Sequence, residues 1–280
     1  MSIQPETARL LLFVGALAFF YVVESLIHTR PWQGSRSRRL LFHAFLAVLN
    51  TALMKLAVAG PLLYWTLVIE RQGWGLVRWL GLTGVSEILV TLVVLDFADY
   101  WWHLWNHRVT FLWRFHQAHH VDTHVDVTTS LRFHPGELMI SSVFKAVWLL
   151  VWGPSMLAFA VFEAAVSLAS QYHHSNFDYP DRLETVLRWF NVTPRMHASH
   201  HSAVTPTLNA NFSTIFSFWD RLFGTYVTPT REHLQVQGLR YGRGRYLDLG
   251  YWFTMPFQHL PTDDELASLP APEGATENDS

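Results

Sequence analysis

Long apolar stretches separated by short polar segments run along most of the chain. The first covers residues 10–27, with Glu24 as its one charged residue. At about 1.5 Å of helical rise per residue it crosses most of a hydrocarbon core that is roughly 30 Å thick. Only Arg9 provides a positive charge before it, and no small-residue cleavage pattern follows. We therefore expect a retained membrane helix instead of a cleaved signal peptide.

Three further apolar regions follow the first. Residues 41–69 contain Gly60-Pro61 and fit either one long kinked span or a span followed by an interfacial piece. Residues 86–105 predict a third span. Residues 138–171 are broken by Gly153-Pro154 and are long enough for a helical hairpin that returns to the same face. The pattern predicts an all-α integral membrane bundle of about four spans or helical hairpins.

A polar loop at residues 28–40 sets the expected orientation. It carries Arg30, Arg36, Arg38 and Arg39, and the positive-inside rule places such a loop in the cytoplasm. If the second apolar region crosses the membrane once, the third span ends on the cytoplasmic side, and the hairpin returns the chain to that side. We expect a histidine-rich helical cap on the cytoplasmic face of a bacterial inner membrane or an ER-type membrane.

The composition supports a membrane protein and narrows its chemistry. Hydrophobic residues make up 50% of the chain and charged residues 15%, and there is no cysteine. Iron–sulfur clusters and cysteine-zinc sites are therefore excluded, so a metal would need nitrogen or oxygen ligands. A net charge of -2 without long basic runs argues against a nucleic-acid partner. We expect one domain over residues 1–260, followed by a disordered acidic tail at residues 261–280.

Histidines occur in three groups with helical spacing. Each group places imidazoles on one face of a helix, because residues three or four apart lie one turn apart. A single membrane histidine is more often structural than a ligand, but three such groups indicate a metal site. Eight imidazoles exceed the ligands that one metal takes, so we expect a binuclear site. The groups are His103 and His107; His116, His119 and His120; and His197, His200 and His201.

Two aspartates share a stripe with the first group. Asp96 and Asp99 lie seven and four residues before His103. Because a metal-bound imidazole usually donates its second nitrogen to a carboxylate or a carbonyl, we expect these aspartates to orient the ligands. Ligand type alone leaves iron, zinc, copper and nickel open. The alternatives to an enzyme are a membrane metal-ion transporter, which also uses intramembrane Asp and His, and a b-type cytochrome.

At these residues the chain resembles the fatty acid hydroxylase/sterol desaturase superfamily of membrane di-iron enzymes. Asp99-Tyr-Trp-Trp-His103-Leu-Trp-Asn-His107 is similar to the first histidine box of the family, and Trp113-Arg-Phe-His116-Gln-Ala-His119-His120 to its second. Thr193-Pro-Arg-Met-His197-Ala-Ser-His200-His201 is similar to the third. The likeness covers about residues 96–226, the expected metal-binding core.

The resemblance extends the candidate site. The element His173-His174-Ser-Asn resembles one that supplies a further ligand, and either histidine fits; the segment Arg132-Phe-His134-Pro marks His134 as an outer partner or an additional ligand. The resemblance implies two iron ions, with zinc able to replace them in a purified sample, and dioxygen as co-substrate. It also implies an external ferredoxin- or cytochrome b5-type electron donor, and hydroxylation or desaturation of a sterol, fatty acyl or related isoprenoid or ether lipid.

Overall fold

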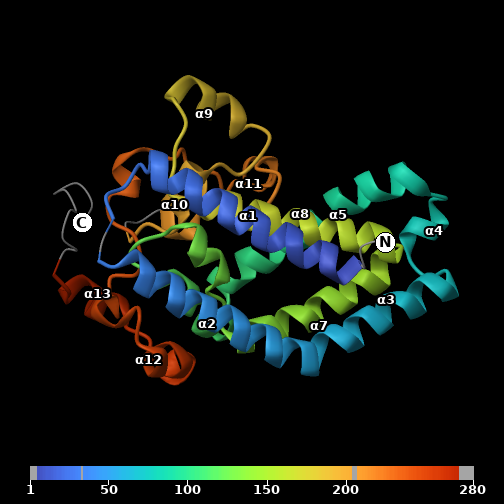
Figure 1. The fold of residues 1–280 in the computed structure, drawn as a ribbon, viewed down its shortest axis with the longest axis horizontal. Helices are drawn as coiled ribbons and strands as arrows, with labels where there is room; N and C mark the ends of the chain where they lie inside the picture. Colours follow the sequence, from blue (N-terminus) through green and yellow to red (C-terminus); the bar gives the residue numbers. More distant parts are fainter. Residues whose placement is uncertain (1–4, 33, 204–206, 271–280) are drawn as a thin grey trace.

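The structure is a computed structural model that describes residues 5–32, 34–203 and 207–270. Within these residues the fold is helical, as predicted, and the β pairing consists of two isolated bridges. Long helices pack side by side along the longest axis of the molecule (Figure 1). They are α1 (Pro5–Ile27), α2 (Arg36–Met54), α3 (Gly60–Gln72), α5 (Gly84–Arg108), α7 (Pro135–Trp152) and α8 (Met156–His174).

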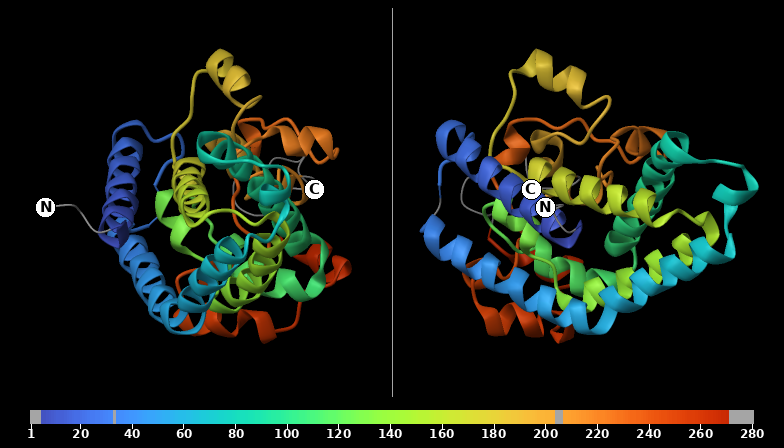
Figure 2. Two further views of the ribbon diagram at one scale, coloured as in Figure 1. Left: turned by 90° about the vertical axis from the view of Figure 1, so that its right-hand side faces the viewer. Right: turned by 45° about the vertical axis from the view of Figure 1, so that its right-hand side comes forward.

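Shorter helices lie at the ends and sides of this bundle. In Figure 1, α10, α12 and α13 gather at the left end, α4 lies at the right end, and α9 projects from the body. Figure 2 shows the same projection of α9 from two further sides. The bounds are α4 (Leu76–Trp79), α6 (Thr110–His120), α9 (Asp181–Leu187), α10 (Pro194–His200), α11 (Phe218–Leu222), α12 (Leu249–Thr254) and α13 (Asp263–Ser268).

The apolar stretches form helices of the predicted kind, but they differ in how well they suit a membrane. Among the described residues, α1 and α7 are each long and apolar enough to cross a bilayer. The segment with Gly60-Pro61 is bent by 47° between Arg36–Met54 and Ala57–Trp79, and it counts as a third candidate if the pair is one span. The predicted helices at α5 and α8 exist, yet the number of spans stays a prediction. Their polar residues, such as Asp96 and His173, lie buried within the bundle.

The chain reverses direction between α7 and α8, as predicted, with its turn at Gly153, and the return to the same membrane face stays a prediction. This residue ends α7 in the left-handed conformation at φ 73°. The backbone there packs directly against the loop after α3, and a Cβ at Gly153 would lie 1.9 Å from the carbonyl oxygen of Trp74. Only glycine combines this conformation with so close an approach.

We therefore expect Gly153→Ala to lower the free energy of unfolding by about 2–4 kcal/mol, through left-handed strain and a steric clash. The control is Gly15→Ala in α1, where a Cβ meets nothing within 4 Å. That substitution should be neutral or slightly stabilising, because alanine favours helix more than glycine does. Thermal unfolding in detergent measures both, and equal melting temperatures for the two variants would contradict the account.

A buried charge network ties α2 to the segment that follows α6. Arg39, 1% exposed, donates to Asp122 at 2.6 Å and to Asp126 at 3.0 Å. Thr129 adds a hydrogen bond to Asp122, and Asp126 caps the short helix Val127–Leu131. The network fixes the end of α6, which carries three candidate ligands, against the bundle.

The carboxyl-terminal segment is only partly described. The structure places α13 at Asp263–Ser268, with Thr262 and Glu265 forming a capping box. Residues 271–280 lie outside the described residues, so the disordered tail stays a prediction.

Candidate metal centre

Four helices bring the histidines together. The last turns of α5 and α8, the end of α6 and all of α10 meet at one end of the bundle. The chain turns at Val109, between α5 and α6, so that the histidines of the two helices face each other. Thr193 caps α10 by accepting from the backbone N–H of Met196, and Pro194 begins that helix, as is common at the first helical position.

Nine of the ten predicted ligands form two separate groups. Within each group, one candidate ligand atom per histidine lies within 4.8 Å of all the others. Adjacent histidines divide between the groups: His119 and His201 belong to one, and His120 and His200 to the other. The first histidine group is His103, His107, His116, His120 and His200; the second histidine group is His119, His174, His197 and His201.

The second histidine group has the shape of a coordination shell. The Nε2 atoms of His119 and His197 lie 3.1 and 3.0 Å from that of His174, and the Nε2 atoms of His197 and His201 are 3.2 Å apart. Ligand nitrogens about 2.0–2.1 Å from a tetrahedral metal lie roughly 3.3 Å from one another. The spacing of these four nitrogens therefore fits a single ion at their centre.

The first histidine group holds ring nitrogens that have no partner among the described residues. They include both nitrogens of His107 and of His120, and Nε2 of His116 and of His200. A buried nitrogen without a partner costs free energy, so such a concentration indicates a bound ligand. Neutral imidazole nitrogens suit a transition metal, and the donor set therefore fits one.

Backbone carbonyls of one loop orient the first histidine group. His103 Nδ1 contacts the carbonyl oxygen of Phe212 at 2.8 Å, and His200 Nδ1 contacts that of Ala210 at 2.7 Å. A proton on Nδ1 leaves Nε2 free to bind a metal. Asp220 holds the loop by accepting from the backbone N–H groups of Phe212 and Ser213 at 2.7 and 2.9 Å.

The predicted role of Asp96 was wrong, whereas that of Asp99 stays a prediction. Asp96 accepts from the backbone N–H groups of Ile215 and Phe216 and from the indole of Trp219, so it holds the loop that carries the carbonyls instead of touching an imidazole. Asp99 has no hydrogen-bond partner among the described residues and lines a cavity. The helical spacing correctly predicted that both aspartates lie on the side of α5 that faces the site. The oxygen that orients His103, however, is a backbone carbonyl in a loop more than a hundred residues later in the chain.

His134 does not join either group. Its Nδ1 accepts from the backbone N–H of Gly136 and caps α7, and its Nε2 contacts the carbonyl oxygen of Phe253 at 3.2 Å. Both ring nitrogens are occupied, so the expectation of an additional ligand was wrong. Of the two adjacent histidines at the end of α8, His174 enters the second histidine group. His173 lies beside it, with its ring centroid 3.9 Å from that of His197.

Sequence reasoning missed the acid that contacts a candidate ligand. Glu137, in the first turn of α7, lies 2.8 Å from Nδ1 of His116, and both side chains are buried. This carboxylate–histidine pair is the arrangement that the aspartates were expected to provide. The available signal was its place three residues after His134, but nothing in the local spacing links α7 to α6.

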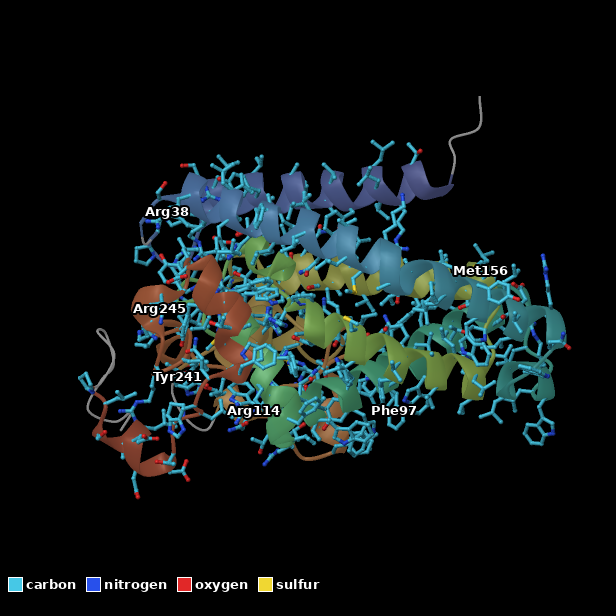
Figure 3. All side chains as sticks on the ribbon, turned by 90° about the horizontal axis from the view of Figure 1, so that it is seen from below. Arg38, Phe97, Arg114, Met156, Tyr241 and Arg245 are labelled. Carbon is cyan, nitrogen blue, oxygen red and sulfur yellow. The ribbon has the colours of Figure 1, made fainter. Side chains whose placement is uncertain are left out.

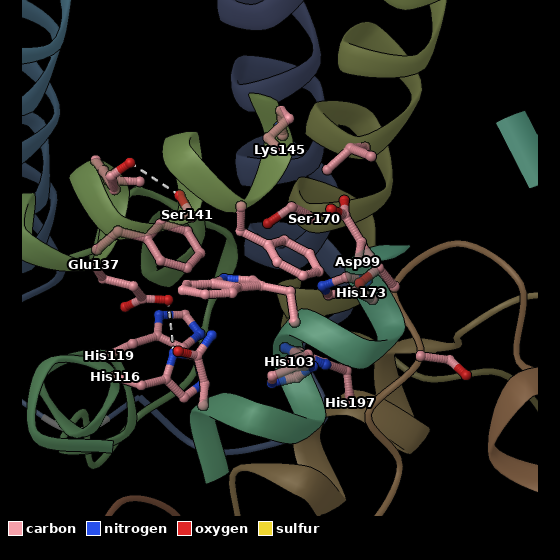
Figure 4. A pocket seen from close by; sticks show the side chains of 18 of the residues that line it. Asp99, His103, His116, His119, Glu137, Ser141, Lys145, Ser170, His173 and His197 are labelled. Atoms are coloured by element: carbon pink, nitrogen blue, oxygen red, sulfur yellow. Dashed lines mark hydrogen bonds and ion pairs between the residues drawn. The ribbon is translucent and has the colours of Figure 1, made fainter. Parts of the chain in front are cut away.

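The two histidine groups line one part of a cavity of about 180 Å³. Figure 4 shows His103, His116, His119 and His197 at one end and Lys145 at the other. Apolar atoms make up most of the exposed wall, so a hydrocarbon can lie against the candidate metal centre, and the polar residues that line the rest are Asp99, Asn106, Glu137, Ser141, Lys145, Ser170, Ser213 and Thr214. The apolar lining residues are Trp102, Phe133, Leu138, Phe144 and Val166.

Burial favours the neutral form of several of these imidazoles. It lowers the pKa of His200 to about 3, and burial together with neighbouring imidazoles lowers the pKa of His120 and His201 well below the usual value. The unfolded chain binds protons near pH 6.5, whereas the folded chain does not until much lower pH. The free energy of unfolding therefore carries no penalty from these histidines above about pH 6.5. It falls as the pH drops from 6.5 toward the pKa values that the histidines have in the folded chain.

We expect metal-free protein to lose stability between about pH 6.5 and 5, by about 1.4 kcal/mol per pH unit for each such histidine. Chemical unfolding of the chelator-treated protein in detergent, followed across this range, measures the slope. An unfolding midpoint that does not change with pH would contradict the burial of neutral imidazoles.

Comparisons with known proteins identify the family. Residues 88–225 match a family model described as "Fatty acid hydroxylase". The chain is 28% identical over 147 residues to an alkylglycerol monooxygenase of Xenopus tropicalis (51% of this chain, 31% of the relative). It is 29% identical to an ornithine lipid hydroxylase of Rhizobium tropici (52% and 43%) and 27% identical to a cholesterol 25-hydroxylase of Rattus norvegicus (50% and 47%).

The chain thus spans less than half the length of these three curated relatives. No solved structure matches it. The matched residues 88–225 contain every member of both histidine groups. Together with the apolar helices, the match indicates a membrane protein. Residues 88–225 thus form a region of the fatty acid hydroxylase family, as the three histidine boxes predicted.

Proposed function

We propose that the chain hydroxylates a lipid with dioxygen at a pair of iron ions held by the two histidine groups. The observation that carries this proposal is the convergence of two adjacent imidazole groups on one cavity with mainly apolar walls. A transporter would need a polar path across the bilayer. Here the histidines gather at one end of the bundle and open onto a cavity whose exposed wall is mainly apolar.

In this proposal each group holds one ion, and His173 remains a candidate extra ligand of the second. Bound iron, supplied with dioxygen and electrons, provides the oxidising power that an unactivated C–H bond requires. Zinc fits the same nitrogens but supplies no redox chemistry. The protein contributes the remaining functions. The carbonyls of Phe212 and Ala210 aim imidazoles, Glu137 holds His116, and the apolar walls position a hydrocarbon and exclude water.

The substrate class follows from the family and the cavity. The relatives are named for an alkylglycerol, an ornithine lipid and cholesterol, which are all lipids. We propose a lipid substrate taken from the membrane, with hydroxylation as the outcome and desaturation as the alternative. Electrons come from an external ferredoxin- or cytochrome b5-type donor, since the chain has no cysteine for an iron–sulfur cluster.

The distribution of positive charge supports a cytoplasmic site. Figure 3 shows Arg38, Arg114 and Arg245 toward one end of the molecule and Met156 at the other. The arginine-rich end is also the end at which the candidate metal centre lies. By the positive-inside rule this end faces the cytoplasm, of a bacterial inner membrane or an ER-type membrane.

Lipid analysis with isotopically labelled dioxygen tests this function. Cells that express the chain should accumulate a lipid that contains one labelled oxygen atom, and cells that express the His120→Ala variant should not. A new alkene in place of the alcohol would identify a desaturase. An unchanged lipid profile in cells whose protein carries its full metal content would contradict the proposal.

A further inference from the structure

A group of charges lies in the bundle away from the histidines. Lys145, in the middle of α7, donates to Glu163 on α8 at 2.6 Å, and Arg9 on α1 lies 3.7 Å from the same carboxylate. Helix α7 is apolar enough to cross a membrane, and a charge within a span is costly unless it has a function. These charges play no part in holding the candidate metal ions.

Their position links two cavities. Lys145 lines the cavity of the candidate metal centre, together with Asp99, and also a second cavity of about 210 Å³. The second cavity is bounded by α1 and by the bent segment between α2 and α3, and Glu163 and Arg9 line it. Lys145 lies eight residues beyond Glu137, which is about 12 Å along a helix. Lys145 is thus well separated from the histidine groups, whereas Asp99 lies one helical turn before His103.

Lys145 and Asp99 both have hydrogen-bonding capacity that the described residues do not use. An ammonium group has three donors, and Lys145 uses one of them on Glu163. The Asp99 carboxylate accepts no hydrogen bond from any described residue. Figure 4 shows Asp99 and Ser170 on the same side of the cavity, between Lys145 and His173. A ligand that fills this region can donate to Asp99, which otherwise has no hydrogen-bond partner there, and can accept from a remaining donor of Lys145.

We infer that Asp99, Lys145 and Glu163 bind the hydroxyl group of the lipid substrate, with the carbon to be oxidised held at the other end of the cavity. A hydroxyl both donates and accepts, so it satisfies Asp99 and Lys145 together. A carboxylate has no donor for Asp99, an ammonium has no acceptor for Lys145, and a plain hydrocarbon satisfies neither. Glu163 keeps Lys145 in place. The inference rests on the proposed function, because it assigns one part of the substrate.

Equilibrium binding to the purified full-length protein in detergent tests the inference, with hexadecanol, its methyl ether and hexadecanoate as probes. The wild type should bind hexadecanol about 10- to 100-fold more tightly than the methyl ether, the factor that a charge-assisted hydrogen bond provides. Asp99→Leu should reduce this preference by about tenfold or more, because only the alcohol can donate to Asp99. Lys145→Met should weaken the binding of hexadecanol and of its ether alike by about tenfold, because both oxygens accept from Lys145. Hexadecanoate should bind more weakly than hexadecanol.

Matched controls separate binding from folding. Lys55→Met and Asp264→Leu change exposed residues that line neither cavity, and they should keep the wild-type preference. The double variant Lys145→Met/Glu163→Gln removes both partners of the ion pair, so it avoids an unpaired carboxylate and should still bind hexadecanol and its ether more weakly than the wild type does. Metal content and melting temperature report the fold of each variant.

Three results would overturn the inference: equal binding of hexadecanol and its ether by the wild type, an unchanged preference in Asp99→Leu together with unchanged hexadecanol binding in both Lys145 variants, or tightest binding of hexadecanoate. The labelled-oxygen experiment is independent of these outcomes. A protein that oxidises lipids without the hydroxyl preference keeps the proposed function and loses this inference. A protein that shows the hydroxyl preference without oxidising a lipid keeps this inference and loses the proposed function.

Discussion

Replacing His200 with alanine should lower the bound metal from about two ions per chain to about one and abolish lipid oxidation. His200 supplies a buried Nε2 to the first histidine group, and the carbonyl of Ala210 fixes its ring. Loss of an outer partner of a metal ligand already costs about 10- to 100-fold in affinity or activity, so loss of a ligand should cost at least about 100-fold. His174→Ala should do the same to the second histidine group. Metal analysis and turnover assays measure both effects.

The matched control is His259→Ala. His259 is exposed, pairs with Glu265 and lies in neither group. This variant should keep its metal and its activity. Full metal content and turnover in His200→Ala and His174→Ala would show that the two groups are not metal sites.

Replacing Arg39 with methionine should destabilise the protein by about 3–5 kcal/mol, because it leaves Asp122 and Asp126 charged, buried and without their cation. Burial opposes the charge on both carboxylates, yet the charge of Arg39 lowers the pKa of each. The ion pairs of Arg39 with the two aspartates therefore stabilise the folded protein at any pH above the usual aspartate pKa. Unfolding in denaturant at neutral pH measures the loss.

Arg38→Met provides the control one residue away. Arg38 is exposed and contributes only its backbone N–H to the cap of α2. Its replacement should change stability by less than about 0.5 kcal/mol. Similar unfolding midpoints for the two arginine variants would mean that the buried network does not hold the end of α6 in place.

The sequence predicted what depends on local spacing. Histidines three or four residues apart on a helix must share a face, and the three boxes did converge when α5, α6 and α10 packed together. The turn at Gly153 was likewise visible as Gly-Pro between two apolar runs. Both features need information only from neighbouring residues.

Features that depend on tertiary contact were missed or assigned to the wrong residue. The carbonyl that faces His103 belongs to Phe212, and the acid that faces His116 is Glu137. A backbone carbonyl leaves no trace in a side-chain pattern. The contact of His116 with Glu137 requires α7 to pack on α6, which no spacing encodes. Asp96 was recognised as important for a reason that proved wrong, since it supports the site through a loop.

The most direct test of the central claim is a crystal structure of the iron-loaded protein with anomalous scattering measured at the iron edge. We predict two iron peaks, one among His103, His107, His116, His120 and His200, and the other among His119, His174, His197 and His201. A single peak, or peaks outside these two groups, would contradict the account.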